Sequence, residues 1–248
     1  MTENTYIKKY VIGYYETGYD KKLKPTQWLN YFQDAAIWHG EHVGRGLKFL
    51  DEHDLLWVLM EWDICIFDQA PFADTVTVKT RQHSSNGLYC KRIYEAVNDE
   101  GKVIASAESI WMMLQKSSMK IIKVPDYILS AYGGKADRKS WIKTNKLDYI
   151  HDSDSMVLTE VKVNINDIDS NHHVNNQKYV EWAVQQIPYE IFVEFPIKRI
   201  RVNYLKSALN GYNLYLETRI IKEDEGYTLK QSVRDLENVM YCIIELRL

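Results

Sequence analysis

Residues 57–67 have the sequence WVLMEWDICIF, in which apolar side chains occupy alternate positions. The apolar members of this alternation are Val58, Met60, Trp62, Ile64 and Ile66. A period of two is typical of a β-strand that buries one face against a core. The segment therefore predicts one strand of an antiparallel sheet.

The same alternation recurs along the chain, whereas helical spacing is confined to two segments. Apolar residues recur every three or four positions in 26–39 and 175–187, which predicts a helix in each. The segment 129–155 contains paired glycines, scattered lysines and the sequence DSDS, which is typical of a linker. Further strands are predicted over 75–81, 102–114, 199–206, 212–221 and 239–247.

The two halves of the chain have the same order of elements, namely a loop, a helix and about four strands. Residues 31–35 align with 179–183, and residues 76–81 align with 214–219. Agreement in both order and spacing indicates a tandem duplication. We therefore predict an α+β protein built from two units, each a curved antiparallel sheet wrapped around one long helix. The predicted boundaries are 1–130 for the N-terminal unit, 131–155 for a crossover linker and 156–248 for the C-terminal unit.

Composition excludes several classes of protein. The chain has 248 residues, of which 46% are hydrophobic and 26% charged, so a disordered chain is excluded. Its net charge of −3 gives no basic excess for binding nucleic acid. The three cysteines lie far apart, which argues against a disulfide framework or a thiolate metal site. We expect a cytoplasmic protein with no membrane span and no signal peptide.

The densest polar cluster, NINDIDSNHHVNNQK at 164–178, immediately precedes the second predicted helix. Asp169, Asn171 and His173 alternate there, so an extended backbone would project all three to one side. A carboxylate, an amide and an imidazole beside helix N–H groups are the components of an acyl-transfer site. The alternative is a helix-capping loop, in which Asn, Asp and Ser are common.

The repeat favours chemistry over capping. Aligned with the first half, Asp169, Asn171 and His173 fall near Asp20, Lys22 and Lys24. Two loops with the same structural task should need the same caps, yet only the second carries an asparagine and a histidine. We therefore expect one half to be equipped for chemistry.

The sequence DIDSNHHVNNQKYVEW at 167–182 resembles the signature of the acyl-acyl carrier protein thioesterases, the plant enzymes and their bacterial relatives. The sequences YFQDAA at 31–36 and WVL at 57–59, the turn at 71–74 and the strand around Trp111 also resemble that family. The resemblance implies a double hot-dog fold. It also implies hydrolysis of the thioester between a fatty acyl chain and the phosphopantetheine of acyl carrier protein, which ends fatty acid elongation.

Residue by residue, the resemblance assigns Asp169, Asn171 and His173 to the catalytic Asp, Asn and His of the family. The family also has a Glu, followed in plant members by a Cys, on the strand after the second helix. Ser207 and Ala208 stand at these two positions here. A cysteine nucleophile is therefore absent, and we expect attack by water, activated by His173 or Asp169. Glu181 is a reserve base and Ser207 a weaker candidate nucleophile.

The resemblance also implies that the core of the first half lines an acyl tunnel. We expect no cofactor, and we expect no metal because the adjacent histidines at 172–173 point to opposite sides of an extended chain and no second pair of ligands is spaced to help. The candidate substrate-binding residues are Trp57, Met60, Trp62, Trp111 and Met113. Because carrier proteins are acidic, we expect a basic patch. Its candidate residues are Lys135, Arg138, Lys139, Lys143 and Lys146, or Arg199, Arg201 and Lys206 near the site. An acyl-CoA thioesterase and a non-catalytic acyl-binding protein stay open as alternatives, as does a homodimer.

Overall fold

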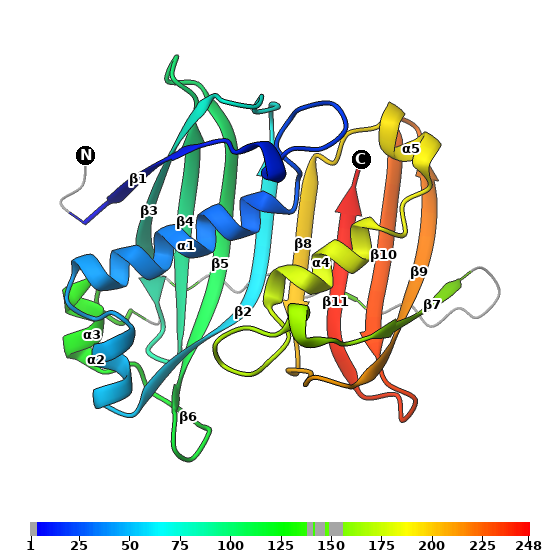
Figure 1. The fold of residues 1–248 in the computed structure, drawn as a ribbon. Helices are drawn as coiled ribbons and strands as arrows, with labels where there is room; N and C mark the ends of the chain where they lie inside the picture. Colours follow the sequence, from blue (N-terminus) through cyan, green and yellow to red (C-terminus); the bar gives the residue numbers. More distant parts are fainter. Residues whose placement is uncertain (1–3, 138–140, 142–146, 149–155) are drawn as a thin grey trace. The chain divides into compact units, whose positions relative to one another are not determined.

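The computed structural model describes residues 4–137, 141, 147–148 and 156–248. The chain divides into two compact units, Met1–Thr144 and Asn145–Leu248, which we call the N-terminal unit and the C-terminal unit. Each unit consists of one antiparallel sheet with a long helix lying across one of its faces (Figure 1). None of the helices in the described residues is both long enough and apolar enough to cross a membrane.

The sheet of the N-terminal unit has the strand order β1-β3-β4-β5-β2, with β6 paired to β5. The helix α1 covers one face of this sheet (Figure 1). The strands are β1 (Tyr6–Val11), β2 (Leu55–Ile66), β3 (Thr75–Ser85), β4 (Tyr89–Val97), β5 (Val103–Gln115) and β6 (Lys120–Ile122). The helices are the 3-10 turn η1 (Tyr14–Glu16), α1 (Gln27–His42), α2 (Leu47–Glu52) and α3 (Asp126–Ala131).

The sheet of the C-terminal unit has the corresponding order, β7-β9-β10-β11-β8. The helix α4 lies across it, and the amide of Gln231 on β10 donates to the Ala183 carbonyl of α4 at 2.9 Å. The strands are β7 (Val157–Lys162), β8 (Arg199–Tyr204), β9 (Asn213–Glu223), β10 (Gly226–Arg234) and β11 (Met240–Arg247). The helices are the 3-10 turn η3 (Ile165–Asp167), α4 (Asn176–Val184) and α5 (Tyr189–Glu194).

The two sheets have matching registers, which confirms the predicted duplication. Tyr10 of β1 lies opposite Val76 of β3, and Val161 of β7 lies opposite Leu214 of β9. The alignment of residues 76–81 with 214–219 is therefore correct. Each unit contains a strand, a 3-10 turn, a long helix, a short helix and then four long strands. The α+β architecture predicted from the sequence is confirmed.

The burial of the two long helices agrees with the predicted alignment of Tyr31 with Tyr179. The residues buried at the same spacing are Leu29, Tyr31, Phe32 and Ala35 in α1 and Gln177, Tyr179, Val180 and Ala183 in α4. The helices begin at different distances from the bridge residues that precede them: α1 begins four residues after Leu23, and α4 begins two residues after Val174.

The predicted face of β2 is also wrong in its first half. The pairing of β2 with β5 shifts register between Leu59 and Glu61, so Met60 is the extra residue of a β-bulge. Leu55 and Leu59 are buried before the bulge, and Trp62 and Ile64 are buried after it. The bulge moves the buried positions from odd to even numbers, which a strict period of two cannot express.

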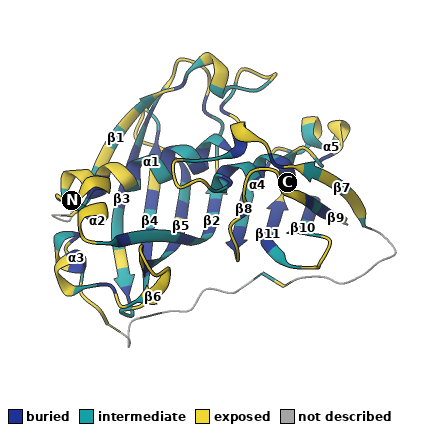
Figure 2. Ribbon diagram, turned by 60° about the horizontal axis from the view of Figure 1, so that its bottom comes forward, coloured by how far each residue is buried: buried dark blue, intermediate teal, exposed yellow. Residues whose placement is uncertain are grey.

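Several elements were not predicted, namely β1, β4, β6, β7, β10, α2, α3 and α5. Each of the three short helices has six residues, which is too few for a helical period to emerge. The strands β1 and β7 have no buried residue, as expected of edge strands with little apolar alternation. Figure 2 shows buried residues concentrated along the inner strands, whereas α5 is largely exposed.

The N-terminal unit buries a polar pair beneath the last turn of α1. His39 is 2% exposed and stacks on the ring of Tyr6. Its Nδ1 atom lies 2.8 Å from Nη1 of Arg92 on β4, and because a guanidinium can only donate, His39 accepts this hydrogen bond. Burial, with the nearby Arg92 charge, lowers the pKa of His39 to about 3.

We expect this histidine to make the protein less stable in acid. Between an unfolded pKa of 6.5 and a folded pKa of about 3, the unfolded state binds a proton that the folded state does not. The contribution of neutral His39 is therefore complete above pH 6.5 and falls as the pH drops through this window, by up to about 1.4 kcal/mol per pH unit. Urea unfolding of wild type and His39→Gln between pH 7 and pH 4 measures the difference in slope. Equal slopes would contradict the assignment.

Candidate active site

The polar segment before α4 forms a tight turn. Ile168 and Val174 form an isolated antiparallel bridge that closes it. Inside the bridge, the Asp169 N–H donates to the His173 carbonyl at 2.8 Å, and His172 adopts a left-handed backbone with φ of 62°. We call residues 168–174 the motif turn.

The carboxylate of Asp169 folds back onto the motif turn. Its Oδ1 atom accepts the N–H of Asn171 at 2.8 Å and the N–H of His173 at 3.4 Å. The backbone is therefore not extended, and the prediction that alternation alone aligns the three side chains is wrong. Asn171 is exposed, whereas Asp169 and His173 are half-buried. The turn still gathers all three residues within one short segment.

Hydrogen bonds fix the motif turn to the segment that follows β8. The Val174 N–H donates to the Ala208 carbonyl at 2.9 Å, and the Ala208 N–H donates to the hydroxyl oxygen of Tyr179 at 3.1 Å. The Tyr204 hydroxyl group donates to the Asn176 carbonyl at 2.9 Å. The two tyrosines hold the start of α4 against this segment, a role that the sequence analysis missed. The position of Tyr179 inside the motif was the available signal.

This connection brings Ser207 and Ala208, the residues that the resemblance aligns with the family's Glu and Cys, next to the motif turn. Ser207 is exposed, and Ala208 is fully buried. Cys242 lies opposite Tyr204 in the sheet, but it is fully buried and burial raises its pKa well above the ordinary value. Such a thiol is unreactive, so Cys242 does not take the place of the family's Cys.

Glu181 is occupied by interactions within α4. Its carboxylate accepts the side-chain amide of Gln177 at 2.7 Å and pairs with the Lys178 ammonium at 2.8 Å. These contacts favour a structural role over that of a reserve base. Within the part of the chain that the structure describes, no group of three or more His, Cys, Asp or Glu side chains is arranged to hold a metal ion.

The N-terminal unit contains the same turn. The Gly18 N–H donates to the Lys22 carbonyl at 2.8 Å, and Lys21 adopts a left-handed backbone with φ of 59°. Thr17 and Leu23 form the closing bridge. The counterparts of Asp169, Asn171 and His173 are therefore Gly18, Asp20 and Lys22. The predicted counterparts Asp20, Lys22 and Lys24 are wrong by two residues.

Four of the five candidate acyl-binding residues share the face of the N-terminal sheet that α1 covers. Trp57 lies opposite Met113, and after the bulge the same face continues with Trp62. Trp111 has the same strand parity as Met113. Met60 is the exception because it is the bulged residue. Trp62 and Met113 are buried, whereas Trp57 and Trp111 are half-buried.

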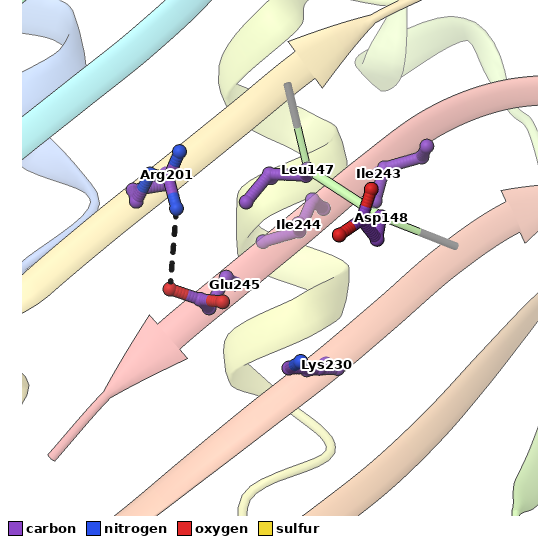
Figure 3. A pocket seen from close by; sticks show the side chains of 7 residues that line it. All are labelled: Leu147, Asp148, Arg201, Lys230, Ile243, Ile244 and Glu245. Atoms are coloured by element: carbon purple, nitrogen blue, oxygen red, sulfur yellow. Dashed lines mark ion pairs between the residues drawn. The ribbon is translucent and has the colours of Figure 1, made fainter. Parts of the chain in front are cut away.

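The candidate basic residues of β8 face away from α4. Arg201 pairs with Glu245 of β11 at 3.6 Å beside a pocket of about 80 Å³ on the face opposite the helix (Figure 3). The expectation that Arg201 lies near the motif turn is therefore wrong, because the sheet separates them. Lys206 is exposed in the segment next to the motif turn. Of the crossover lysines and arginines, Lys135 is exposed, and Arg138, Lys139, Lys143 and Lys146 lie outside the described residues.

Two duplicated units, each with a long helix lying across one antiparallel sheet, define a tandem hot-dog protein. The chain belongs to the acyl-ACP thioesterase family: the model of the N-terminal domain matches residues 3–132 and that of the C-terminal domain matches residues 150–245.

Curated relatives agree with this assignment. The chain is 26% identical over 252 residues to the acyl-[acyl-carrier-protein] hydrolase FATB3, chloroplastic, of Cuphea viscosissima, covering 94% of this chain and 60% of that protein. It is 25% identical over 222 residues to the oleoyl-acyl carrier protein thioesterase 2, chloroplastic, of Arabidopsis thaliana, covering 82% of this chain and 60% of that protein. The chain thus spans about 60% of the length of these relatives.

Solved structures confirm the double hot-dog fold. A putative oleoyl thioesterase from Lactobacillus plantarum has a TM-score of 0.92 at 19% identity, covering 98% of this chain and 95% of that one. The 12:0-ACP thioesterase from Umbellularia californica has a TM-score of 0.85 at 21% identity, covering 98% and 93%. At this identity the likeness concerns the fold alone.

The duplicated turn predicts which carboxylate of the motif is structural. Asp167 is 6% exposed and accepts the Asn164 N–H at 2.9 Å, as Glu16 accepts the Gly13 N–H at 2.7 Å in the N-terminal unit. Asp169 has no such counterpart: Gly18 stands at its position, and the N–H of Lys22 is accepted there by the carboxylate of Asp20 at 3.1 Å. We expect Asp169→Ala to lower the free energy of unfolding by about 1 kcal/mol or less, and Asp167→Ala by about 2 kcal/mol or more. Urea unfolding measures both. The reverse order would show that Asp169 is the structural residue.

Proposed function

We propose that this protein hydrolyses the thioester of fatty acyl-acyl carrier protein and releases a free fatty acid and the carrier thiol. One observation carries the proposal. The same backbone turn is built twice, and only the C-terminal copy carries Asp169, Asn171 and His173. Since the N-terminal turn forms with Gly18, Asp20 and Lys22 at these positions, folding alone does not explain Asn171 and His173. The reaction itself is inferred from the chain's membership of the acyl-ACP thioesterase family.

The proposed mechanism is attack by water. His173 or Asp169 takes a proton from the water as its oxygen bonds to the carbonyl carbon of the thioester. The negative charge moves to the carbonyl oxygen, where the Asn171 amide and N–H groups at the start of α4 stabilise it. The carbonyl then re-forms, the carbon–sulfur bond breaks, and the proton passes to the leaving thiolate. Asp169 already accepts two backbone N–H groups of the turn, which leaves His173 as the freer base.

The division of labour between the units is part of the proposal. The C-terminal unit supplies the motif turn, and the N-terminal unit binds the acyl chain on the face that α1 covers. Trp57, Trp62, Trp111 and Met113 share that face, which supports this assignment. Exposed Lys206, beside the motif turn, is the basic residue best placed to meet an acidic carrier protein.

We expect His173→Ala to lower turnover about 100-fold or more, because a positioned general base contributes at least this much. The measurement is release of free thiol from palmitoyl- and oleoyl-carrier protein. Lys22→Ala is the matched control, since Lys22 occupies the same position in the N-terminal turn and should leave turnover unchanged. Near wild-type turnover in His173→Ala would exclude the proposed base.

The same assay separates the alternatives. Preference for the palmitoyl- and oleoyl-CoA esters over the carrier esters would indicate an acyl-CoA thioesterase. Binding of acyl chains without turnover of any thioester would indicate an acyl-binding protein. The feature that favours this last alternative is Ser207, which stands where the family has a Glu.

A further inference from the structure

Two neighbouring cations on β4 are equally buried but differently partnered. Lys91 and Arg92 are each 9% exposed. Because successive residues of a strand face opposite sides of the sheet, their side chains lie on opposite faces. The Lys91 ammonium pairs with the Glu108 carboxylate at 2.9 Å. In the described residues, the Arg92 guanidinium has no carboxylate partner.

The groups that contact Arg92 are all neutral. Its Nη1 atom donates to Nδ1 of His39 at 2.8 Å and to the Thr80 hydroxyl oxygen at 3.3 Å. The guanidinium carbon lies 5.2 Å from the ring centre of Tyr132. Burial raises the pKa of Tyr132 and that of Cys90, the latter to about 11, so neither offers an anion at neutral pH. A buried cation without a counter-charge is costly.

Two further buried nitrogen atoms in this region make no hydrogen bond in the described residues. Gln82 lies directly opposite Arg92 in the sheet, and its buried Nε2 atom makes no hydrogen bond in the described structure. The buried Nε atom of Arg45, whose charge acts on Tyr132, is likewise unpaired. The carboxylate of Glu41, which also acts on Tyr132, accepts the Leu47 N–H at 2.8 Å. The site thus has an excess of donors and one uncompensated positive charge.

Apolar side chains adjoin this polar cluster. Cys90 and Tyr132 belong to a core cluster that Trp57 packs against. The other members of the cluster are Leu50, Leu55, Met113, Val124, Ile128 and Leu129. A ligand that suits both surroundings is an aliphatic chain that carries a carboxylate, because the carboxylate satisfies the planar guanidinium and the chain lies against the core.

We propose that Arg92, held by His39 and Thr80, is a binding group for the carboxylate of an aliphatic chain in the N-terminal unit. The proposal rests on the proposed function, since the acyl substrate or its product brings such a chain to the protein. Two sources have this chemistry: the free fatty acid that hydrolysis releases, and an acyl chain with a carboxylate at its far end. Arg92 is then a specificity-determining residue.

Calorimetric titration of the whole protein with dodecanoate and with dodecanol tests the proposal. The two probes share a chain length and differ in charge. We expect wild type to bind dodecanoate about tenfold more tightly or better, as a charge-assisted hydrogen bond implies. Arg92→Met should bind both equally, and Arg92→Lys should keep a reduced preference. Lys91→Met is the matched control, because it removes the neighbouring paired cation and should keep the full preference.

Equal binding of the two probes by wild type overturns the proposal even if Arg92→Met does not fold. An undiminished preference in a folded Arg92→Met overturns it as well. Neither measurement requires hydrolysis, so failure of the proposed function is seen separately, as absence of turnover in wild type.

Hydrolysis of N-acetylcysteamine thioesters distinguishes the two sources. A chain-end carboxylate predicts that wild type prefers the 11-carboxyundecanoyl thioester over the dodecanoyl thioester, and that Arg92→Met loses this preference. A product carboxylate predicts that added dodecanoate inhibits wild type and inhibits Arg92→Met at least tenfold less. If Arg92→Met changes neither the preference nor the inhibition, Arg92 is not the binding group.

Discussion

In each unit, one backbone hydrogen bond links two segments that are distant in sequence. One segment is the turn before the long helix, and the other follows the first strand after that helix. In the N-terminal unit the Leu23 N–H donates to the Ala70 carbonyl at 2.8 Å, and in the C-terminal unit the Val174 N–H donates to the Ala208 carbonyl at 2.9 Å. This bond fixes where the helix begins over its sheet. It also brings position 207 beside the motif turn, so the constraint that starts the helix assembles the site.

Buried charged side chains on the two faces of the sheets differ in whether they have an oppositely charged partner. On the face of the C-terminal sheet away from α4, Glu217 and Glu245 are nearly buried, and each pairs with an arginine. On the corresponding face of the N-terminal sheet, Lys91 pairs with Glu108. The helix-covered face of the N-terminal sheet holds the guanidinium of Arg92 among neutral groups. The buried charges named here on the faces away from the long helices are thus paired with an opposite charge. Arg92, on the face that α1 covers, differs from them because it has no carboxylate partner in the described residues, and this difference supports a binding role.

The sequence could predict those features that depend on a period sustained over several turns or strands. The helices α1 and α4, the duplication and the β3–β9 alignment are of this kind. Features that depend on a single residue could not be predicted from the sequence. The bulge at Met60 reversed the parity of β2, and the left-handed His172 turned an apparently extended motif into a tight turn. The pair of His39 and Arg92 joins positions 53 residues apart, which no local pattern connects.

Duplication explains how one copy of the turn can carry the side chains proposed for catalysis without loss of the fold. The hydrogen bonds that close both turns run between backbone atoms, from Gly18 to Lys22 and from Asp169 to His173. Side chains at these positions are therefore free to differ, whereas the carboxylate that caps the preceding 3-10 turn is present in both units as Glu16 and Asp167. Backbone bonds and this buried carboxylate maintain the geometry. Within that geometry, the Asp169 carboxylate accepts two N–H groups of its turn, and the Asp20 carboxylate accepts one in the N-terminal unit. Asn171 and His173 stand where the N-terminal turn has Asp20 and Lys22, and their presence in only one of two equivalent turns supports the proposed chemistry.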